Sequence, residues 1–182
     1  MIYVFLANGF EEIEALAVVD VLRRAELDVV TVGVGEEFIV GSHQIPVVAD
    51  IRERELVLDD KVEAIVLPGG MPGTLNLEKS PVVQKAIDWA FENDKFVCAI
   101  CAAPSILGHK GLLKGKNAVC FPGFEEELLG ANVSKDYVCK DGKIITAKGM
   151  GSAIEFGLQI AEELTNPTEV KKIRASLQIY NG

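Results

Sequence analysis

Cys101 lies where an apolar stretch typical of a β-strand stops and a stretch compatible with a helix begins. Residues 96–100 are apolar throughout, and residues 102–113 can continue as a helix. This arrangement predicts a nucleophile on a sharp strand-to-helix turn, the position that serine takes in G-x-S-x-G enzymes. Unpaired backbone N–H groups and the positive dipole end of the following helix would favour the thiolate, the reactive form of cysteine. A small buried cysteine at the end of a strand is the structural alternative.

The elements that must position this cysteine alternate regularly between strand and helix. Strands that alternate with helices indicate βαβ units in a mainly parallel sheet covered on both faces. Ligands bind at the carboxyl ends of strands in such sheets, so residues 9–14, 68–73 and Cys101 should meet there. The expected strands are 2–6, 28–34, 64–67, 96–100 and 118–121, with an irregular strand pair in 39–50 and a hairpin of 137–140 with 143–147; the expected helices are 11–25, 80–93, 102–113, 152–164 and 168–176.

Composition limits the classes of protein to which the chain can belong. Its 182 residues, 49% of them apolar and 25% charged, are typical of one globular domain over residues 1–182. A net charge of −9 argues against nucleic acid as a partner, because phosphate binding needs a basic surface. No stretch approaches the ~18 apolar residues of a membrane span, and the apolar N-terminus lacks the basic flank of a signal peptide. We therefore expect a cytoplasmic protein with reduced cysteines.

Neither a metal site nor a nucleotide cofactor is expected from the sequence. The two histidines, His43 and His109, do not stand at ligand spacing from a cysteine pair. His109 is expected to interact with the dipole at the end of its helix. The glycine-rich segments match neither G-x-G-x-x-G nor a P-loop.

The other three cysteines are expected to play lesser parts. Cys98 and Cys101 spell C-x-x-C, but ~10 Å of extended chain separates them, more than the ~7 Å that a disulfide spans. Their odd spacing along a strand predicts side chains on opposite faces, with Cys98 in the core. Cys120 is a candidate resolving thiol, and Cys139 beside the hairpin turn is expected to be a bystander.

Four short segments carry a family resemblance. They read Leu-Ala-Asn-Gly-Phe-Glu-Glu-Ile-Glu at 6–14, Val-Leu-Pro-Gly-Gly at 66–70, Ala-Ile-Cys-Ala-Ala-Pro at 99–104 and Lys-Gly-Met-Gly-Ser at 148–152. In this order and spacing, the chain resembles the ThiJ/PfpI superfamily, in particular its DJ-one branch, the Parkinsonism-associated protein deglycases. The resemblance covers nearly the whole chain. It implies a flavodoxin-like three-layer α/β/α sandwich that is usually a homodimer, and no cofactor is expected for it.

The resemblance also implies roles for individual residues. The family's reactive cysteine falls on Cys101, its hydrogen-bonding carboxylic acid on Glu14, and its oxyanion-type donors on the backbone N–H groups of Gly70 and Ala102. A carboxyl buried beside a thiolate should have a raised pKa, because burial and like charge both disfavour the anion, and it could then act as a general acid or base. The structural alternatives are an acid that merely stabilises the helix dipole and a glycine loop without function.

Two positions depart from the family pattern. Phe121 stands where many members carry a histidine near the cysteine, which argues against a mechanism with a histidine general base. His43 stands where an arginine reaches the site from the partner subunit. His43 is therefore a candidate contributor to the site across a dimer interface.

The favoured interpretation is a cofactor-independent glyoxalase or protein deglycase with a stress-response role. Cys101 would attack small reactive carbonyls such as glyoxal or methylglyoxal, or their adducts on glycated protein side chains, while Glu14 moves the proton. The main alternative is a non-enzymatic redox sensor or chaperone that responds through oxidation of Cys101. A cysteine peptidase or amidase is a weaker alternative, because amide cleavage usually needs a histidine partner and Phe121 occupies that position.

Overall fold

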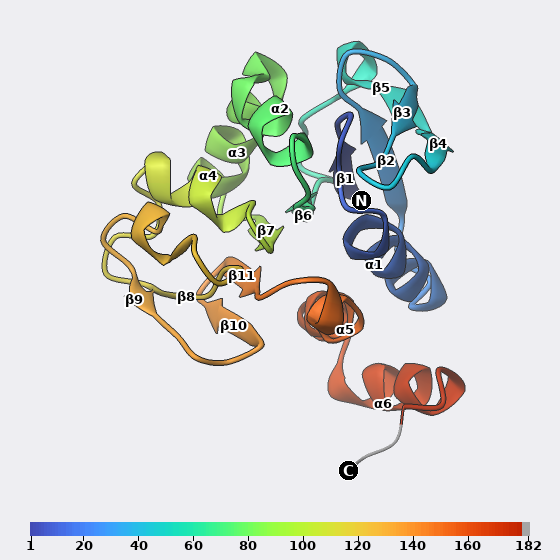
Figure 1. Cartoon of the computed structure of the whole chain (residues 1–182). Coiled ribbons are helices and arrows are strands. Elements are labelled where there is room, and N and C mark those ends of the chain that lie inside the picture. Colours follow the sequence, from blue (N-terminus) through green and yellow to red (C-terminus); the bar gives the residue numbers. More distant parts are fainter. Residues whose placement is uncertain (180–182) are drawn as a thin grey trace.

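A seven-stranded sheet forms the centre of the computed structural model, which describes residues 1–179 (Figure 1). The strand order is β10-β11-β7-β6-β1-β2-β5, and every neighbouring pair is parallel except β10 with β11. The strands are β1 (Ile2–Leu6), β2 (Val29–Gly33), β5 (Ile51–Arg52), β6 (Ala64–Leu67), β7 (Phe96–Ile100), β10 (Val138–Asp141) and β11 (Ile144–Ala147). Because β1, β6 and β7 are buried throughout, both faces of the sheet must be covered.

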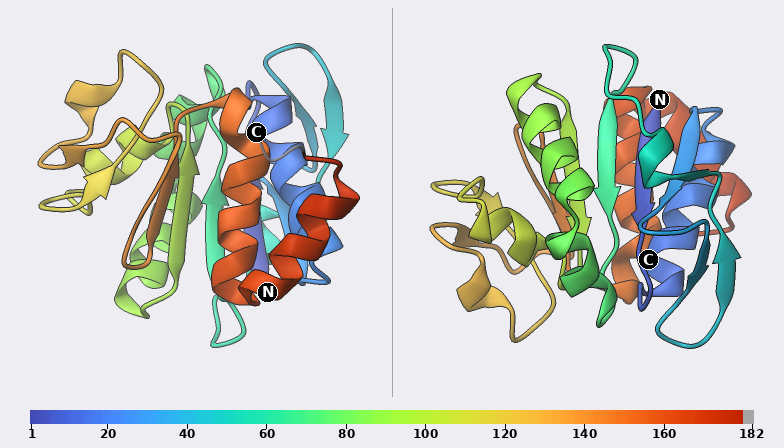
Figure 2. Two further views of the ribbon diagram at one scale, coloured as in Figure 1. Left: turned by 90° about the horizontal axis from the view of Figure 1, so that it is seen from below. Right: turned by 90° about the horizontal axis from the view of Figure 1, so that it is seen from above.

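Helices cover the two faces of this sheet (Figure 2). One apolar cluster packs α1 (Glu12–Arg24), α5 (Ala153–Leu164) and α6 (Pro167–Ser176) on one face, and a second packs α2 (Gly73–Lys79), α3 (Pro81–Glu92) and α4 (Pro104–His109) on the other. Alternate residues of β1 enter the two clusters, Val4 in the first and Phe5 in the second. The flavodoxin-like three-layer sandwich with a mainly parallel sheet is thus confirmed. No helix in the described part of the chain is long and apolar enough to cross a membrane.

Smaller elements lie at the edges of the sandwich. The irregular pair expected in 39–50 is an antiparallel hairpin. The expected hairpin of β10 and β11 is also present, with Asp141 as the last residue of β10 and Gly142 and Lys143 in the turn. Ser80 caps α3 by accepting a hydrogen bond from the backbone N–H of Val83, with Pro81 at the first position of the helix, as predicted. The remaining elements are β3 (Phe38–Val40), β4 (Pro46–Val48), β8 (Asn117–Ala118), β9 (Asn132–Val133) and three 3-10 turns, η1 (Glu53–Glu55), η2 (Glu125–Glu127) and η3 (Met150–Ser152).

Two predicted elements are wrong in extent, and α2 was not predicted. The helix expected at 102–113 ends at His109, because Gly111 adopts a φ of +73° that stops the helix. The strand expected at 118–121 is reduced to β8, which pairs with β9 outside the central sheet. The backbone after it turns toward the end of β7, since the N–H of Phe121 donates to the carbonyl of Cys101 at 2.8 Å.

His109 does more than interact with the dipole of α4. Its Nδ1 lies 2.5 Å from a carboxylate oxygen of Glu78 at the end of α2, and its Nε2 lies 2.8 Å from one of Glu127 in η2. Carboxylates accept hydrogen bonds, so the ring can satisfy both only when both nitrogens carry protons. Hydrogen bonds to these two carboxylates accordingly raise the pKa of His109.

Candidate active site

Cys101 occupies a strained turn directly after β7. Its φ is +65°, in the left-handed region that costs a non-glycine residue roughly 1–2 kcal/mol. Two backbone hydrogen bonds hold this conformation: its N–H donates to the Ala147 carbonyl at 2.9 Å, and its carbonyl accepts from Phe121. The predicted strand-to-turn position of this cysteine is therefore present, although α4 begins only at Pro104.

Glu14 projects from the first turn of α1 into the site. Its side chain is almost fully buried, and its Oε2 accepts a hydrogen bond from the Gly69 N–H at 2.9 Å. Burial raises the pKa of Glu14 to about 7; hydrogen bonds with the Cys101 thiol and with the backbone of Gly69 and Met150 oppose that rise, while Glu11 adds to it. The carboxyl therefore changes protonation near neutral pH, as a general acid or base should.

The environment of the Cys101 sulfur combines opposing influences. Burial, followed by the charge of Glu14 and the hydrogen bond with it, raises the pKa of Cys101 to about 12, while the backbone N–H groups of Ala102 and Gly70 lower it. The predicted effect of backbone N–H groups after the strand is therefore present, since they lower this pKa. Burial and the nearby carboxyl group outweigh it, so the pKa of Cys101 is raised overall. Glu14 and Cys101 together release one proton near neutral pH and retain the second to alkaline pH.

The turn after β6 brings backbone donors to the pair. A Cβ at Gly69 would lie 2.6 Å from the Cys101 Cβ and 2.7 Å from the Glu14 Oε2, so only glycine fits between the two side chains. Gly70 has a φ of +90°, which turns its N–H toward the sulfur, where the N–H of Ala102 also points. Two N–H groups that converge on one sulfur form a place where a developing oxyanion can be stabilised.

Two backbone contributors were not singled out from the sequence. The N–H of Gly69 is bonded to Glu14, and that of Met150, at the start of η3, also stabilises the Glu14 carboxylate. Both residues belong to the glycine-containing segments at 66–70 and 148–152. Glycine next to a strand end is the signal that could have identified them, because it permits a close backbone approach.

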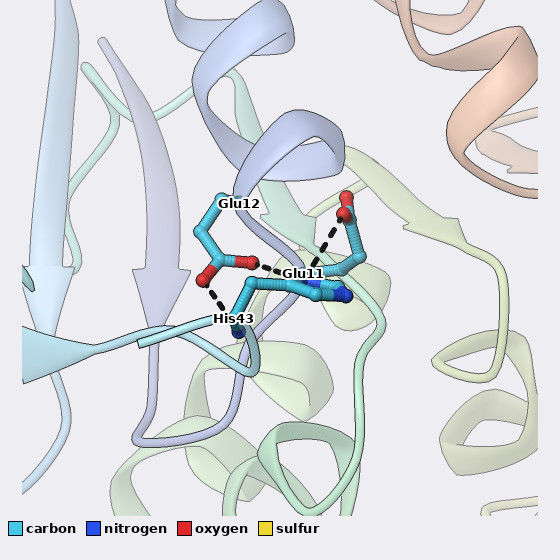
Figure 3. Close-up of side chains that lie close together, drawn as sticks. All are labelled: Glu11, Glu12 and His43. Carbon is cyan, nitrogen blue, oxygen red and sulfur yellow. Dashed lines mark hydrogen bonds and ion pairs between the residues drawn. The ribbon is translucent and has the colours of Figure 1, made fainter. Parts of the chain in front are cut away.

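His43 lies close to the start of α1, with its side chain 70% exposed (Figure 3). Its Nδ1 is 2.9 Å from the Oε2 of buried Glu12, and its backbone N–H donates to the other oxygen at 2.7 Å. The hydrogen bond that Glu12 accepts from the ring raises the pKa of His43. Burial acts to raise the pKa of Glu12, but the hydrogen bonds that this carboxylate accepts from His43 and from the backbone outweigh it and lower that pKa overall. Glu12 thus holds the loop around His43 in place and does more than stabilise the helix dipole.

Glu11, Glu12 and His43 also bring their ligand atoms within 4.8 Å of one another. Within residues 1–179 they are the one such group of three metal-binding side chains. Their hydrogen bonds to each other and to the backbone already account for the arrangement, because Glu11 caps α1 by accepting from the Glu14 N–H at 2.8 Å.

All four cysteines are free. The expectation that Cys98 and Cys101 face opposite sides of the sheet is wrong, since both pack against the cluster beneath α1 and α5. Cys101 has left the strand, so the alternation of strand side chains no longer applies to it. Cys120 packs in the opposite cluster, although the next residue, Phe121, is bonded to the backbone of Cys101; its role as a resolving thiol stays a prediction.

A cysteine on a strained turn at the carboxyl edge of a parallel sheet, hydrogen-bonded to a buried glutamate, defines a cysteine-centred α/β sandwich protein. Residues 1–163 match the DJ-1/PfpI family, and the chain belongs to that family. The resemblance inferred from the four segments is thereby confirmed.

Individual relatives are similar over almost their whole length. The chain is 35% identical to protein dj-1beta of Drosophila melanogaster, covering 98% of this chain and 97% of the relative. The crystal structure of Drosophila melanogaster DJ-1beta has a TM-score of 0.92 at 33% identity and covers 98% of this chain and 97% of that one. The glutathione-independent glyoxalase DJR-1.2 of Caenorhabditis elegans is 29% identical and covers 90% of this chain and 87% of its own.

Proposed function

We propose that the protein is a cofactor-independent glyoxalase and deglycase that converts α-oxoaldehydes, or their adducts on amines and thiols, into 2-hydroxy acids. One observation carries the proposal: the Glu14 carboxyl is hydrogen-bonded to the Cys101 thiol, where two backbone N–H groups converge. Glu14 changes protonation near neutral pH, so it can both take and return a proton. The similarity to a protein named as a glyoxalase agrees with this chemistry.

In the proposed reaction, Cys101 attacks the aldehyde carbon while Glu14 takes the thiol proton. The N–H groups of Gly70 and Ala102 stabilise the oxyanion, which is protonated to a hemithioacetal. Glu14 then moves the proton from the former aldehyde carbon to the neighbouring carbon through an enediol, which leaves a thioester on Cys101. Water hydrolyses the thioester, so that one oxoaldehyde and one water give one 2-hydroxy acid and free cysteine.

The test is methylglyoxal consumption with lactate as the measured product. Cys101→Ser and Glu14→Gln should each lose at least about a hundredfold in kcat/KM, because a general base alone contributes roughly that much. Cys139→Ser and Glu36→Gln, which alter a cysteine and a glutamate outside the site, should behave like the wild type. Turnover that survives Cys101→Ser would refute the proposal.

A second candidate function is redox sensing through Cys101. Cys101 is partly exposed, and the same two N–H donors could hold the oxygens of a sulfinic acid. A structure of Toxoplasma gondii DJ-1 in an oxidised form, 35% identical with a TM-score of 0.90, agrees with this chemistry. Absent methylglyoxal turnover, with a gain of two oxygens on Cys101 under mild peroxide by mass spectrometry, would favour sensing and a stress-response or chaperone role.

Assembly and location belong to the same proposal. Ile13 and Leu16 on α1 and Phe38 and Val48 on the β3–β4 hairpin are exposed, and such apolar surfaces often mark a subunit interface. We expect a homodimer in which His43 lies close to the partner's site, which sedimentation equilibrium would check. Four free cysteines agree with a cytoplasmic location.

A further inference from the structure

A hollow of about 340 Å³ is formed by segments that adjoin the proposed catalytic pair, although neither Cys101 nor Glu14 lines it. Its lining includes Phe121, Pro122, Tyr137, Lys148 and Met150. Three large apolar side chains of this lining remain well exposed, Phe121 at 48%, Tyr137 at 71% and Met150 at 54%. Apolar side chains gathered around a hollow are typical of a ligand site.

The walls of this hollow are the segments that hold the catalytic pair. The backbone of Phe121 is bonded to that of Cys101 at 2.8 Å, and the backbone of Met150 is bonded to the Glu14 carboxyl. Gly149 lies between the Phe121 ring and the Glu14 carboxyl, since a Cβ on Gly149 would be 3.2 Å from that ring and 3.9 Å from the Glu14 Oε1. A substituent that extends from the reacting carbon past Phe121 and Gly149 would therefore reach this hollow.

We infer that the hollow binds the substituent of the oxoaldehyde and favours an aromatic substituent over a methyl group; the inference rests on the proposed function. Its volume greatly exceeds the ~30 Å³ that one water, about the size of a methyl group, occupies in the liquid. The rings of Phe121 and Tyr137 offer aromatic contacts, and Met150 offers a thioether. The Lys148 ammonium lies over the Tyr137 ring, 5.4 Å from its centre.

The experiment compares kcat/KM for phenylglyoxal, which gives mandelate, with that for methylglyoxal, which gives lactate. The ratio of the two values cancels effects on the chemistry that both aldehydes share. Phe121→Ala should lower the ratio about tenfold, the effect typical of lost apolar contacts in a pocket. Phe91→Ala is the matched control, because Phe91 is 43% exposed at the end of α3 and lines a different hollow, so its ratio should equal that of the wild type.

Two results would overturn the inference while the proposed function stands. One is a ratio that Phe121→Ala leaves unchanged while methylglyoxal is still consumed. The other is a ratio that falls as far in Lys148→Met as in Phe121→Ala, because the hollow would then select by charge and not by apolar contact.

If the wild type consumes neither aldehyde, the proposed function fails and binding tests the inference by itself. Titration calorimetry would compare mandelate with lactate on the wild type and on Phe121→Ala. Mandelate that binds about tenfold more tightly than lactate, with a preference lost in Phe121→Ala, supports the inference. Equal affinities overturn it.

Discussion

Replacing Glu14 by glutamine should stabilise the protein at alkaline pH and change its stability little at acidic pH. The side chain is almost fully buried, and burial raises its pKa from 4.5 to about 7. A carboxyl whose pKa is higher in the folded state binds its proton more tightly there. Folding therefore loses stability as the pH rises from 4.5 to about 7, and the loss is complete above that range.

The size of the effect follows from the two pKa values. They differ by about 2.5, and each pKa unit corresponds to about 1.4 kcal/mol, so ionised Glu14 lowers the free energy of unfolding by about 3 kcal/mol well above pH 7. Near pH 5 the same group costs only about 1 kcal/mol. Glutamine keeps the shape without the charge, and its oxygen can still accept the Gly69 N–H. The stability of the variant relative to its parent should thus increase by roughly 2 kcal/mol between about pH 5 and about pH 8.

Urea unfolding followed by the fluorescence of Trp89, the single tryptophan, would measure this change. Both proteins should carry Cys101→Ser, so that the thiol does not titrate with the carboxyl. A difference between variant and parent that is the same at both pH values would refute the reasoning, because Glu14 would then titrate in the folded protein as it does in the unfolded chain.

Three further predictions follow from other contacts. Gly69→Ala should cost roughly 1–3 kcal/mol of stability in urea unfolding and abolish methylglyoxal turnover, because the new methyl would lie 2.6 Å from the Cys101 Cβ; normal stability and turnover would contradict it. His109→Asn should destabilise the protein below pH 6.5 and progressively less as the pH rises through the raised pKa of His109, since only the charged ring bonds both carboxylates. Thermal unfolding across pH would check this. A loss of stability that does not change with pH would show that the charge of His109 does not stabilise the fold. Ser80→Ala should lower the urea midpoint by an amount equivalent to about 1 kcal/mol, because α3 loses its N-cap and Glu53 loses a hydrogen bond from the Ser80 hydroxyl, and Ser80→Thr, which keeps the hydroxyl, should restore it.

Several elements could be predicted because their signals are local. The strands at 2–6, 64–67 and 96–100 were predicted with the bounds that the structure has, since continuous apolar runs of this length suit buried parallel strands. Ser80 with Pro81 marked the start of α3, and Asp141 with Gly142 marked the hairpin to within one residue of its turn at Gly142 and Lys143. Each signal acts over a few neighbouring residues, so the folded environment did not overrule it.

Other elements depended on distant parts of the chain. In α4, Gly108 packs against η2 so closely that a Cβ on it would lie 2.0 Å from the Glu127 carbonyl oxygen. The short strand β8 pairs with β9, and β11 takes the place next to β7 in the central sheet. The residues around Gly108 and β8 do not specify these distant partners.

The sequence by itself determined the class of fold and the position of Cys101 on the turn after β7. The reason is that the pattern of apolar residues changes from that of a strand to that of a helix within a few consecutive residues. The tertiary structure decided how that cysteine behaves. Glu14 and Gly69 meet across 55 residues of chain, and their contact with Cys101 sets the burial and charge that govern the pKa of the pair. Side-chain periodicity specifies which face a residue occupies within its own element, whereas desolvation and charge depend on every segment packed around it.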